Sequence, residues 1–196
     1  MRMLIALLLA VFCTGAQAQM RHDPLTSREA DQLRDSAKEP KRRIDLLIGF
    51  AAERVMAMER LRAPSSDISR DTTKDGLDDS GKLAEMLGEL GDLIDELDDN
   101  LEMYGKHGED LRLPLRHVLE AEGEFLQKLK ALEDHATPSE KRGMAAALED
   151  ASESLQDSME GAKALLAGQI EKRGEEKDKK KLNRQEANEG REQPEH

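Results

Sequence analysis

Residues 80–105, SGKLAEMLGELGDLIDELDDNLEMYG, carry the clearest fold signal in the chain. Their large apolar residues recur at alternating steps of four and three, which places them on one side of an α-helix. This stripe consists of Leu83, Leu87, Leu90, Ile94, Leu97, Leu101 and Tyr104. Met86 and Leu93 widen the stripe, as expected for a helix that faces two or more others. Because such a face must be covered, the segment predicts a helical bundle completed by the rest of the chain.

Three further segments have the same periodicity, at residues 40–62, 109–135 and 138–171. Pro40 suits the first position of a helix, where its missing N–H costs nothing. Thr137, Pro138 and Glu140 combine an N-cap, a first-position proline and a capping-box glutamate, which predicts a helix start. Pro114 either restarts the third helix or distorts its first turn. For the last helix we expect an apolar face made of Met144, Leu148, Ala151, Leu155, Met159, Ala162, Leu166 and Ile170.

The flanking segments are polar. Thr26 and Glu29 have the spacing of a capping box, which predicts a short helix ending before Pro40, either loosely docked or a frayed arm. Residues 63–79 are rich in Ser, Thr, Asp, Gly and Pro and predict a long loop. Residues 172–196 are densely charged and predict a disordered tail or a frayed helix. The predicted fold is therefore all-α: an antiparallel bundle of about four long helices within residues 19–171.

The composition supports a helical core. Hydrophobic residues make up 37% of the 196 residues, charged residues another 37% and aromatic residues only 2%. Such an aliphatic core suits helix packing better than a β-sandwich. The net charge of −12 disfavours nucleic acid and anionic membrane surfaces as partners, and leaves cations and cationic partners open. We expect five basic residues to form the outer surface of helix 40–62: Lys41, Arg42, Arg43, Arg54 and Arg60.

The first eighteen residues resemble a signal peptide. Arg2 supplies a positive start, residues 3–12 an apolar run, and residues 16–18 a small-x-small cleavage pattern that predicts cleavage between Ala18 and Gln19. The run is too short for a membrane-spanning helix, and Phe12 is too bulky to precede a lipidated cysteine. Cleavage removes Cys13, the only cysteine, so we expect no disulfide and no stable membrane anchor afterwards. The predicted destination is the periplasm or the exterior.

The sequence lacks a recognisable catalytic constellation. There is no Glu-x-x-His pair, no His-Glu-x-x-His motif, no P-loop and no Gly-x-Ser-x-Gly elbow. We therefore predict no catalytic residues and no cofactor. Asp71 and Asp75 are weak candidates for a metal site, because with Thr73 and Gly76 they match the start of an EF-hand loop. Lys82 replaces the bidentate glutamate at the twelfth position, so no metal site is predicted there.

Glu122 is the one acidic residue in line with an apolar stripe, between Val118 and Phe125. Two interpretations exist: a buried functional carboxylate, or a residue at the edge of a slightly rotated stripe. Because unpaired carboxylates are rarely fully buried, we predict that Glu122 lies at the edge.

These features predict an exported, non-catalytic interaction or structural protein of the cell envelope. A protein partner or self-association fits the long amphipathic helices and the charged tail, because the four-three spacing supports helix pairing within or between chains. Two alternatives are a periplasmic holdase-type chaperone and a helical bundle that binds a small ligand or a cation.

Overall fold

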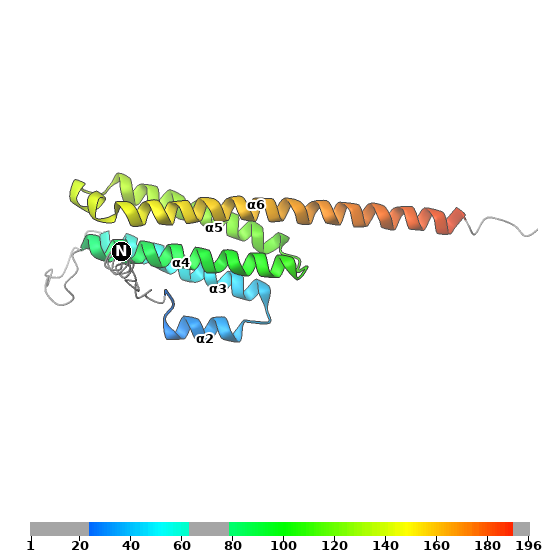
Figure 1. Ribbon diagram of the computed structural model, residues 1–196, viewed down its shortest axis with the longest axis horizontal. Helices are drawn as coiled ribbons and strands as arrows, with labels where there is room; N and C mark the ends of the chain where they lie inside the picture. The colour runs from blue at the N-terminus through cyan, green and yellow to red at the C-terminus, as the bar shows by residue number, and fades with distance from the viewer. Residues whose placement is uncertain (1–23, 63–78, 190–196) are drawn as a thin grey trace, which may run out of the picture.

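A computed structural model describes residues 24–62 and 79–189 of the chain (Figure 1). All secondary structure in these ranges is helical, which confirms the all-α prediction. The helices are α2 (Ser27–Asp35), α3 (Pro40–Arg62), α4 (Asp79–Lys106), α5 (Arg112–Asp134) and α6 (Pro138–Glu189).

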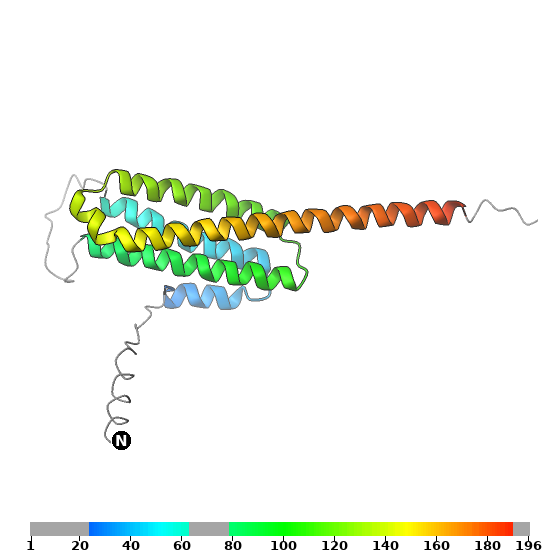
Figure 2. The ribbon, with the colours of Figure 1, turned by 45° about the horizontal axis from the view of Figure 1, so that its top comes forward.

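The helices α3 to α6 form a four-helix bundle, with α2 packed on its outside against α3 (Figures 1 and 2). Consecutive helices of the bundle run in opposite directions. However, α4 packs against α3 and α6, while α5 lies diagonally opposite α4. The connection between α4 and α5 therefore crosses the end of the bundle, and α4 and α6 are parallel neighbours.

Contacts at both ends of the α4/α6 pair confirm its parallel direction. The N-terminal Ser80 of α4 lies beside Gly143, near the start of α6. Further along both helices, Ser158 lies 2.7 Å from Asp98, and Leu165 lies against Gly105. Small residues on both helices let the two backbones approach closely at this contact.

The apolar stripe of α4 lies in the core as predicted, with every one of its seven members buried. The face of α6 differs from the prediction at two places. Ser158, rather than Met159, is buried, and Ile170 is 50% exposed beyond the end of the bundle. The buried face of α6 keeps a strict heptad rhythm, formed by Met144, Leu148, Ala151, Leu155, Ser158 and Ala162.

The helix ends follow the local sequence signals. The Thr137 hydroxyl accepts a hydrogen bond from the Glu140 N–H, and the Glu140 carboxylate accepts one from the Thr137 N–H, as in a capping box. Pro114 lies within the first turn of one continuous α5 helix. Gly108 has φ +80° and ends α4, where the Glu109 N–H bonds back to the Tyr104 carbonyl in a Schellman arrangement.

The helix α6 is 52 residues long and continues well past the bundle (Figure 1). We call residues 172–189 the α6 arm. All side chains from residue 171 to residue 181 are exposed. Of the two forms predicted for the tail, the described part has the helical one.

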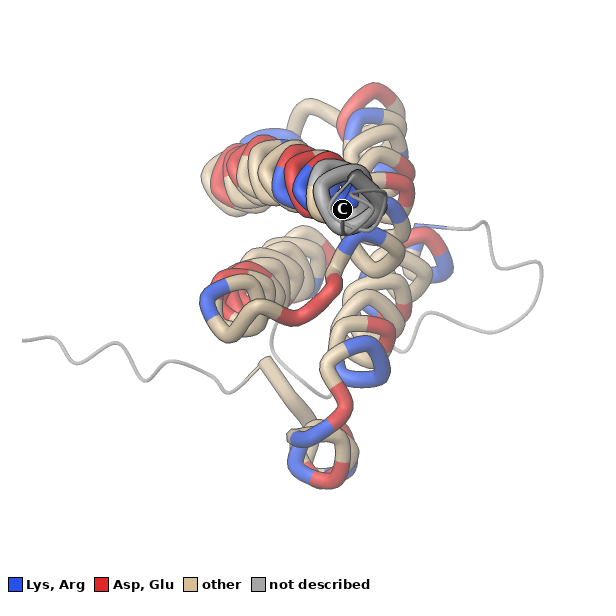
Figure 3. Tube along the Cα trace, turned by 90° about the vertical axis from the view of Figure 1, so that its right-hand side faces the viewer, with Lys and Arg blue, Asp and Glu red and all other residues tan. Residues whose placement is uncertain are grey.

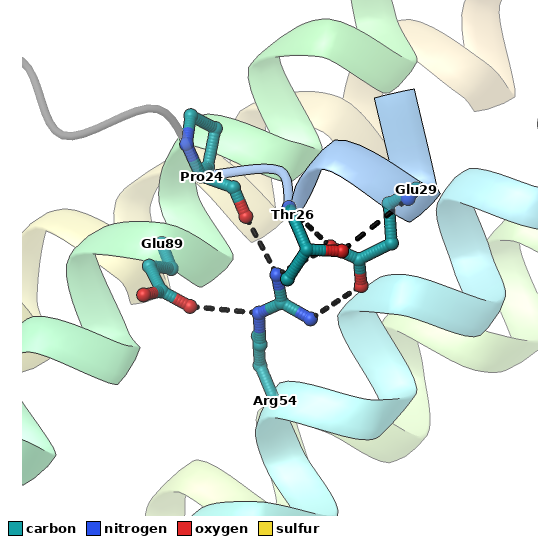
Figure 4. A network of polar contacts seen from close by, with 5 residues as sticks. All are labelled: Pro24, Thr26, Glu29, Arg54 and Glu89. Atoms are coloured by element: carbon teal, nitrogen blue, oxygen red, sulfur yellow. Dashed lines mark hydrogen bonds and ion pairs between the residues drawn. The ribbon is translucent and has the colours of Figure 1, made fainter. Parts of the chain in front are cut away.

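Arg54 of α3 anchors the N-terminal half of α2 (Figure 4). Its guanidinium donates to both carboxylate oxygens of Glu29, at 2.7 and 2.9 Å, to the Pro24 carbonyl at 2.6 Å and to Glu89 of α4 at 2.7 Å. Glu29 also completes the capping box with Thr26. The Arg54 hydrogen bond lowers the pKa of Glu29 to about 2, so this carboxylate is ionised at neutral pH.

Arg43 anchors the other end of α2. It donates to the Leu33 carbonyl at 2.9 Å, to Asn100 at 2.6 Å and to Glu96 at 3.0 Å. The prediction that Arg43 and Arg54 lie on the outer surface of α3 is therefore wrong. Their side chains are only 19% and 12% exposed, because a planar guanidinium can satisfy several acceptors where three helices meet.

We predict that Arg54→Ala releases α2 from the bundle. The substitution leaves Glu29 without its counter-charge, and loss of one partner of a buried pair costs about 3–5 kcal/mol. Hydrogen exchange of the α2 backbone amides should accelerate strongly. The matched control is Arg34→Ala, which removes an exposed pair with Asp31 and should change stability by less than about 1 kcal/mol. Equal exchange rates in both variants would contradict this anchoring role.

A second prediction concerns the α4/α6 contact. A Cβ atom at Gly143 would lie 2.8 Å from the Ser80 hydroxyl and 3.0 Å from its Cβ, whereas a Cβ at Gly161 meets nothing within 4 Å. Gly161→Ala should therefore stabilise the protein by about 1 kcal/mol through helix propensity. Gly143→Ala should destabilise it by about 1–3 kcal/mol through overpacking, as measured by urea denaturation. Adding Ser80→Gly should recover most of that loss; similar effects of the two alanine substitutions would argue against the close contact.

Candidate functional site

Three polar side chains from three helices meet inside the bundle: Asp98 of α4, Glu122 of α5 and Ser158 of α6. The Ser158 hydroxyl oxygen lies 2.7 Å from Asp98 Oδ1 and 2.6 Å from Glu122 Oε1. Glu122 and Ser158 are both 0% exposed, and Asp98 is partly exposed. The prediction that Glu122 lies at the edge of the stripe is therefore wrong. Ser158 supplies the hydrogen bond that lets this carboxyl group enter the core.

Hydrogen-bond counting favours a proton on this cluster. The Ser158 hydroxyl has one hydrogen and donates it to only one of the two carboxyl groups. The other carboxyl group approaches the same oxygen within hydrogen-bond distance, and a proton on that group would give the second contact a hydrogen of its own. The second oxygen of Glu122, Oε2, is buried without a hydrogen-bond partner. A neutral Glu122 avoids most of the cost of burying an ionised carboxylate.

The electrostatics of the cluster favour the same protonation state. Burial raises the pKa of Glu122 to about 7, an effect reinforced by the charge of Asp98 and opposed by the Ser158 hydrogen bond. Burial also raises the pKa of Asp98, and the negative charges of Asp95, Asp99 and Asp157 add to this effect. Within residues 24–62 and 79–189, no cation pairs with Asp98 or Glu122.

A groove of about 520 Å³ lies beside the cluster, between α4 and α6. Leu101, Ala162 and Leu165 contribute apolar surface to it. Asp98 belongs both to the buried cluster and to the groove wall, so it connects the interior of the bundle to its surface. Lys106 and Lys172 lie at the end of the groove from which the α6 arm leaves the bundle.

The surface around this groove is acidic. Neither residues 83–105 of α4 nor residues 143–162 of α6 include a Lys or Arg. In the view along the bundle, acidic residues recur on α4 and α6 on the side away from α3 and α5 (Figure 3). We call this surface the acidic face; it is defined by five exposed residues without an ion pair in the described part of the chain: Asp92, Asp99, Asp150, Glu153 and Asp157.

The other flank of α4 is neutralised. Glu89 pairs with Arg54 at 2.7 Å and Glu96 pairs with Arg43 at 3.0 Å, both across the α3/α4 contact. The charge of α4 is therefore compensated toward α3. Toward α6, Glu102 pairs with Lys106 at 2.7 Å, whereas Asp92 and Asp99 form no ion pair among the described residues. Because of this asymmetry, a positively charged group would gain the most electrostatic stabilisation on the α4/α6 side.

Several residues singled out in the sequence lie outside the described ranges: the cleavage-site residues Ala18 and Gln19, and the weak metal candidates Asp71 and Asp75. Among the residues that the structure does describe, no three His, Cys, Asp or Glu side chains converge as they would around a metal ion. The site that the sequence did not reveal is the Asp98–Ser158–Glu122 cluster. Its signal was present in the strict heptad spacing that links Leu155, Ser158 and Ala162.

Comparison with known proteins gave no match to a family model, to a curated protein or to a solved structure. Within the described ranges, no helix combines the length and the apolar character needed to cross a membrane.

We predict that Glu122→Gln changes how stability depends on pH. A pKa raised from 4.5 to about 7 means that the folded state favours the neutral acid. The stabilisation of the folded state by this bound proton is complete below pH 4.5 and is lost as the pH rises through 7, a change of about 3 kcal/mol. Glutamine is neutral throughout, so the variant should be the more stable form above pH 7.

Urea denaturation between pH 5 and pH 9 measures this difference. The control is Glu120→Gln, which changes an exposed carboxylate on the same helix and should retain the pH dependence of the wild type. Parallel curves for Glu122→Gln and the wild type would show that Glu122 is ionised in the folded protein.

Proposed function

We propose that this chain is an exported, non-catalytic interaction protein of the cell envelope that binds a basic segment of a partner protein on its acidic face. One observation carries the proposal: two parallel neighbouring helices present carboxylates beside a partly apolar groove, and their stretches 83–105 and 143–162 contain no Lys or Arg. Lys106 and Lys172 line one end of the groove. A helix with Lys or Arg on one side and apolar residues on the other suits this surface in both charge and polarity.

The structure of the groove supports a binding role over a purely structural one. A surface that only needed to be soluble would mix both signs of charge, as the outer surface of α5 does with Arg116, Glu120, Glu124 and Lys130. On the acidic face like charges accumulate, which costs stability through mutual repulsion. Charge complementarity with a partner would turn this cost into affinity and into faster association.

Export is part of the proposal and rests on the leader-like sequence of residues 1–18, with its apolar run and small-x-small pattern. In an exported chain that loses this segment, the acidic face would meet envelope proteins rather than nucleic acid, whose phosphates it repels.

Photo-crosslinking in the source cell tests the proposal. A crosslinking amino acid at position 99, on the acidic face, should capture a partner through a Lys- or Arg-rich segment, while the same group at position 120 on α5 should not. Neutralising the face with Asp92→Asn, Asp99→Asn and Asp157→Asn should reduce capture at a nearby reporter position, such as 103, at least severalfold. Added salt should have the same effect, because it screens exposed charges.

Mass spectrometry of the captured chain also reports on export, since removal of the leader makes Gln19 its first residue. Equal capture at positions 99 and 120, or capture that is insensitive to both salt and neutralisation, would contradict binding through the acidic face.

A further inference from the structure

The α6 arm has a chemistry opposite to that of the acidic face. Four of the five residues 177–181 are lysines. Lys177, Lys180 and Lys181 are spaced three and four apart, so they share one side of the helix, and all three are exposed. Their only ion pair within the described residues is a 4.0 Å contact between Lys181 and Asp178, both of which are largely exposed. The arm therefore presents an available row of ammonium groups.

The lysine row cannot reach the acidic face of its own chain, although Lys172 at the start of the arm lines the groove. The arm continues α6 as one uninterrupted helix that points away from the bundle (Figure 1). At about 1.5 Å per residue, the 18 residues of the arm are roughly 27 Å long. Reaching the acidic face, which lies on the bundle itself, would require a sharp reversal of this helix. Any contact between the lysine row and the acidic face must therefore involve two molecules.

We propose that the α6 arm of one copy of this chain docks on the acidic face of a second copy. This inference rests on the proposed function, because it names the basic partner segment as the arm itself. The lysine row faces the carboxylates of α4 and α6, and the stems of the lysines cover the apolar groove wall at Leu101 and Leu165. Since the two surfaces differ, the contact is heterologous, and repetition of it links copies head to tail.

The buried cluster supports this choice of surface. Glu122 is fully buried, has an unpartnered oxygen and is directed from α5 through Ser158 toward Asp98 in the groove wall. Lys106 and Lys172 line the same groove, but no described residue forms an ion pair with Asp98, and an ammonium group there would supply that pair. A lysine of the arm is a donor of this kind, with three N–H groups on a flexible stem.

Charge-swap variants test the proposal by sedimentation velocity on the purified chain at low and high salt. The arm variant carries Lys177→Glu, Lys180→Glu and Lys181→Glu; the face variant carries Asp92→Lys, Asp99→Lys and Asp157→Lys. We expect concentration-dependent association of the wild type at low salt, and roughly tenfold weaker association, or more, in each variant alone. Single exposed pairs contribute little, but three reversals replace attraction by repulsion.

Two further measurements make the test specific. A mixture of the arm variant with the face variant should associate, because each supplies the surface that the other lacks, and a chain with all six substitutions should associate with itself. The control chain carries Lys38→Glu, Lys130→Glu and Lys141→Glu, which change the net charge by the same amount as the arm variant but at exposed positions away from both surfaces, and it should associate like the wild type. Circular dichroism of each variant verifies that the bundle is folded.

A wild-type chain that stays monomeric at low salt, or association that the six-residue swap does not restore, would overturn the proposal. The proposed function can be tested separately from the self-association. If the chain is monomeric but position 99 still captures a basic segment of another envelope protein, the acidic face binds a different partner and only the self-association is wrong. If the copies associate through these surfaces, both proposals stand.

Discussion

The structure depends on how the negative charge of α4 is accommodated by the neighbouring helices. This helix buries a continuous apolar stripe while its remaining surface carries many carboxylates, and residues 83–105 contain no basic residue of their own. Neighbouring helices must therefore supply counter-charge or avoid contact with the carboxylates. Toward α3, Arg43 and Arg54 supply it, and the same two guanidiniums hold α2. Toward α6, small residues face α4, and the carboxylates of both helices remain open to solvent.

The parallel packing of α4 and α6 is consistent with this difference between the two sides of α4. Gly91, Gly105 and Gly143 allow close backbone approach along the contact, so burial of apolar surface outweighs the repulsion between acidic neighbours. The cost of that repulsion appears at Asp98 and Glu122. Glu122 and Ser158 occupy heptad positions that call for apolar residues, and a proton shared with Asp98 would take the place of a cation.

The sequence predicted what depends on periodicity and on local chemistry. The stripe of α4 and the capping boxes at Thr26 and Thr137 are each encoded within a few residues of one another. It did not predict what depends on which helices become neighbours. The inward position of Arg54 and the burial of Glu122 require knowledge of residues that are 25 to 36 positions away, and the order of helices depends on contacts such as Asp98 with Ser158, 60 positions apart. For Glu122, the prediction used the general rule that carboxylates avoid protein cores. Glu122 departs from this rule because Ser158, at a core position of α6, provides a hydrogen-bond partner.

Protonation of the Asp98–Glu122 pair and binding of a cation at Asp98 would each neutralise the same negative charge. A proton on the Asp98–Glu122 pair offsets one negative charge, and an ammonium group at Asp98 would offset the same one. Each therefore weakens the binding of the other by an equal free energy, as thermodynamic linkage requires. With the pKa of Glu122 at about 7, the proton is partly lost near neutral pH, where small changes in acidity shift the balance toward the cation. Because Ser158 lies on the same helix as the arm and on the wall facing α4, this single position connects the charge state of the core to the surface on which a basic segment would dock.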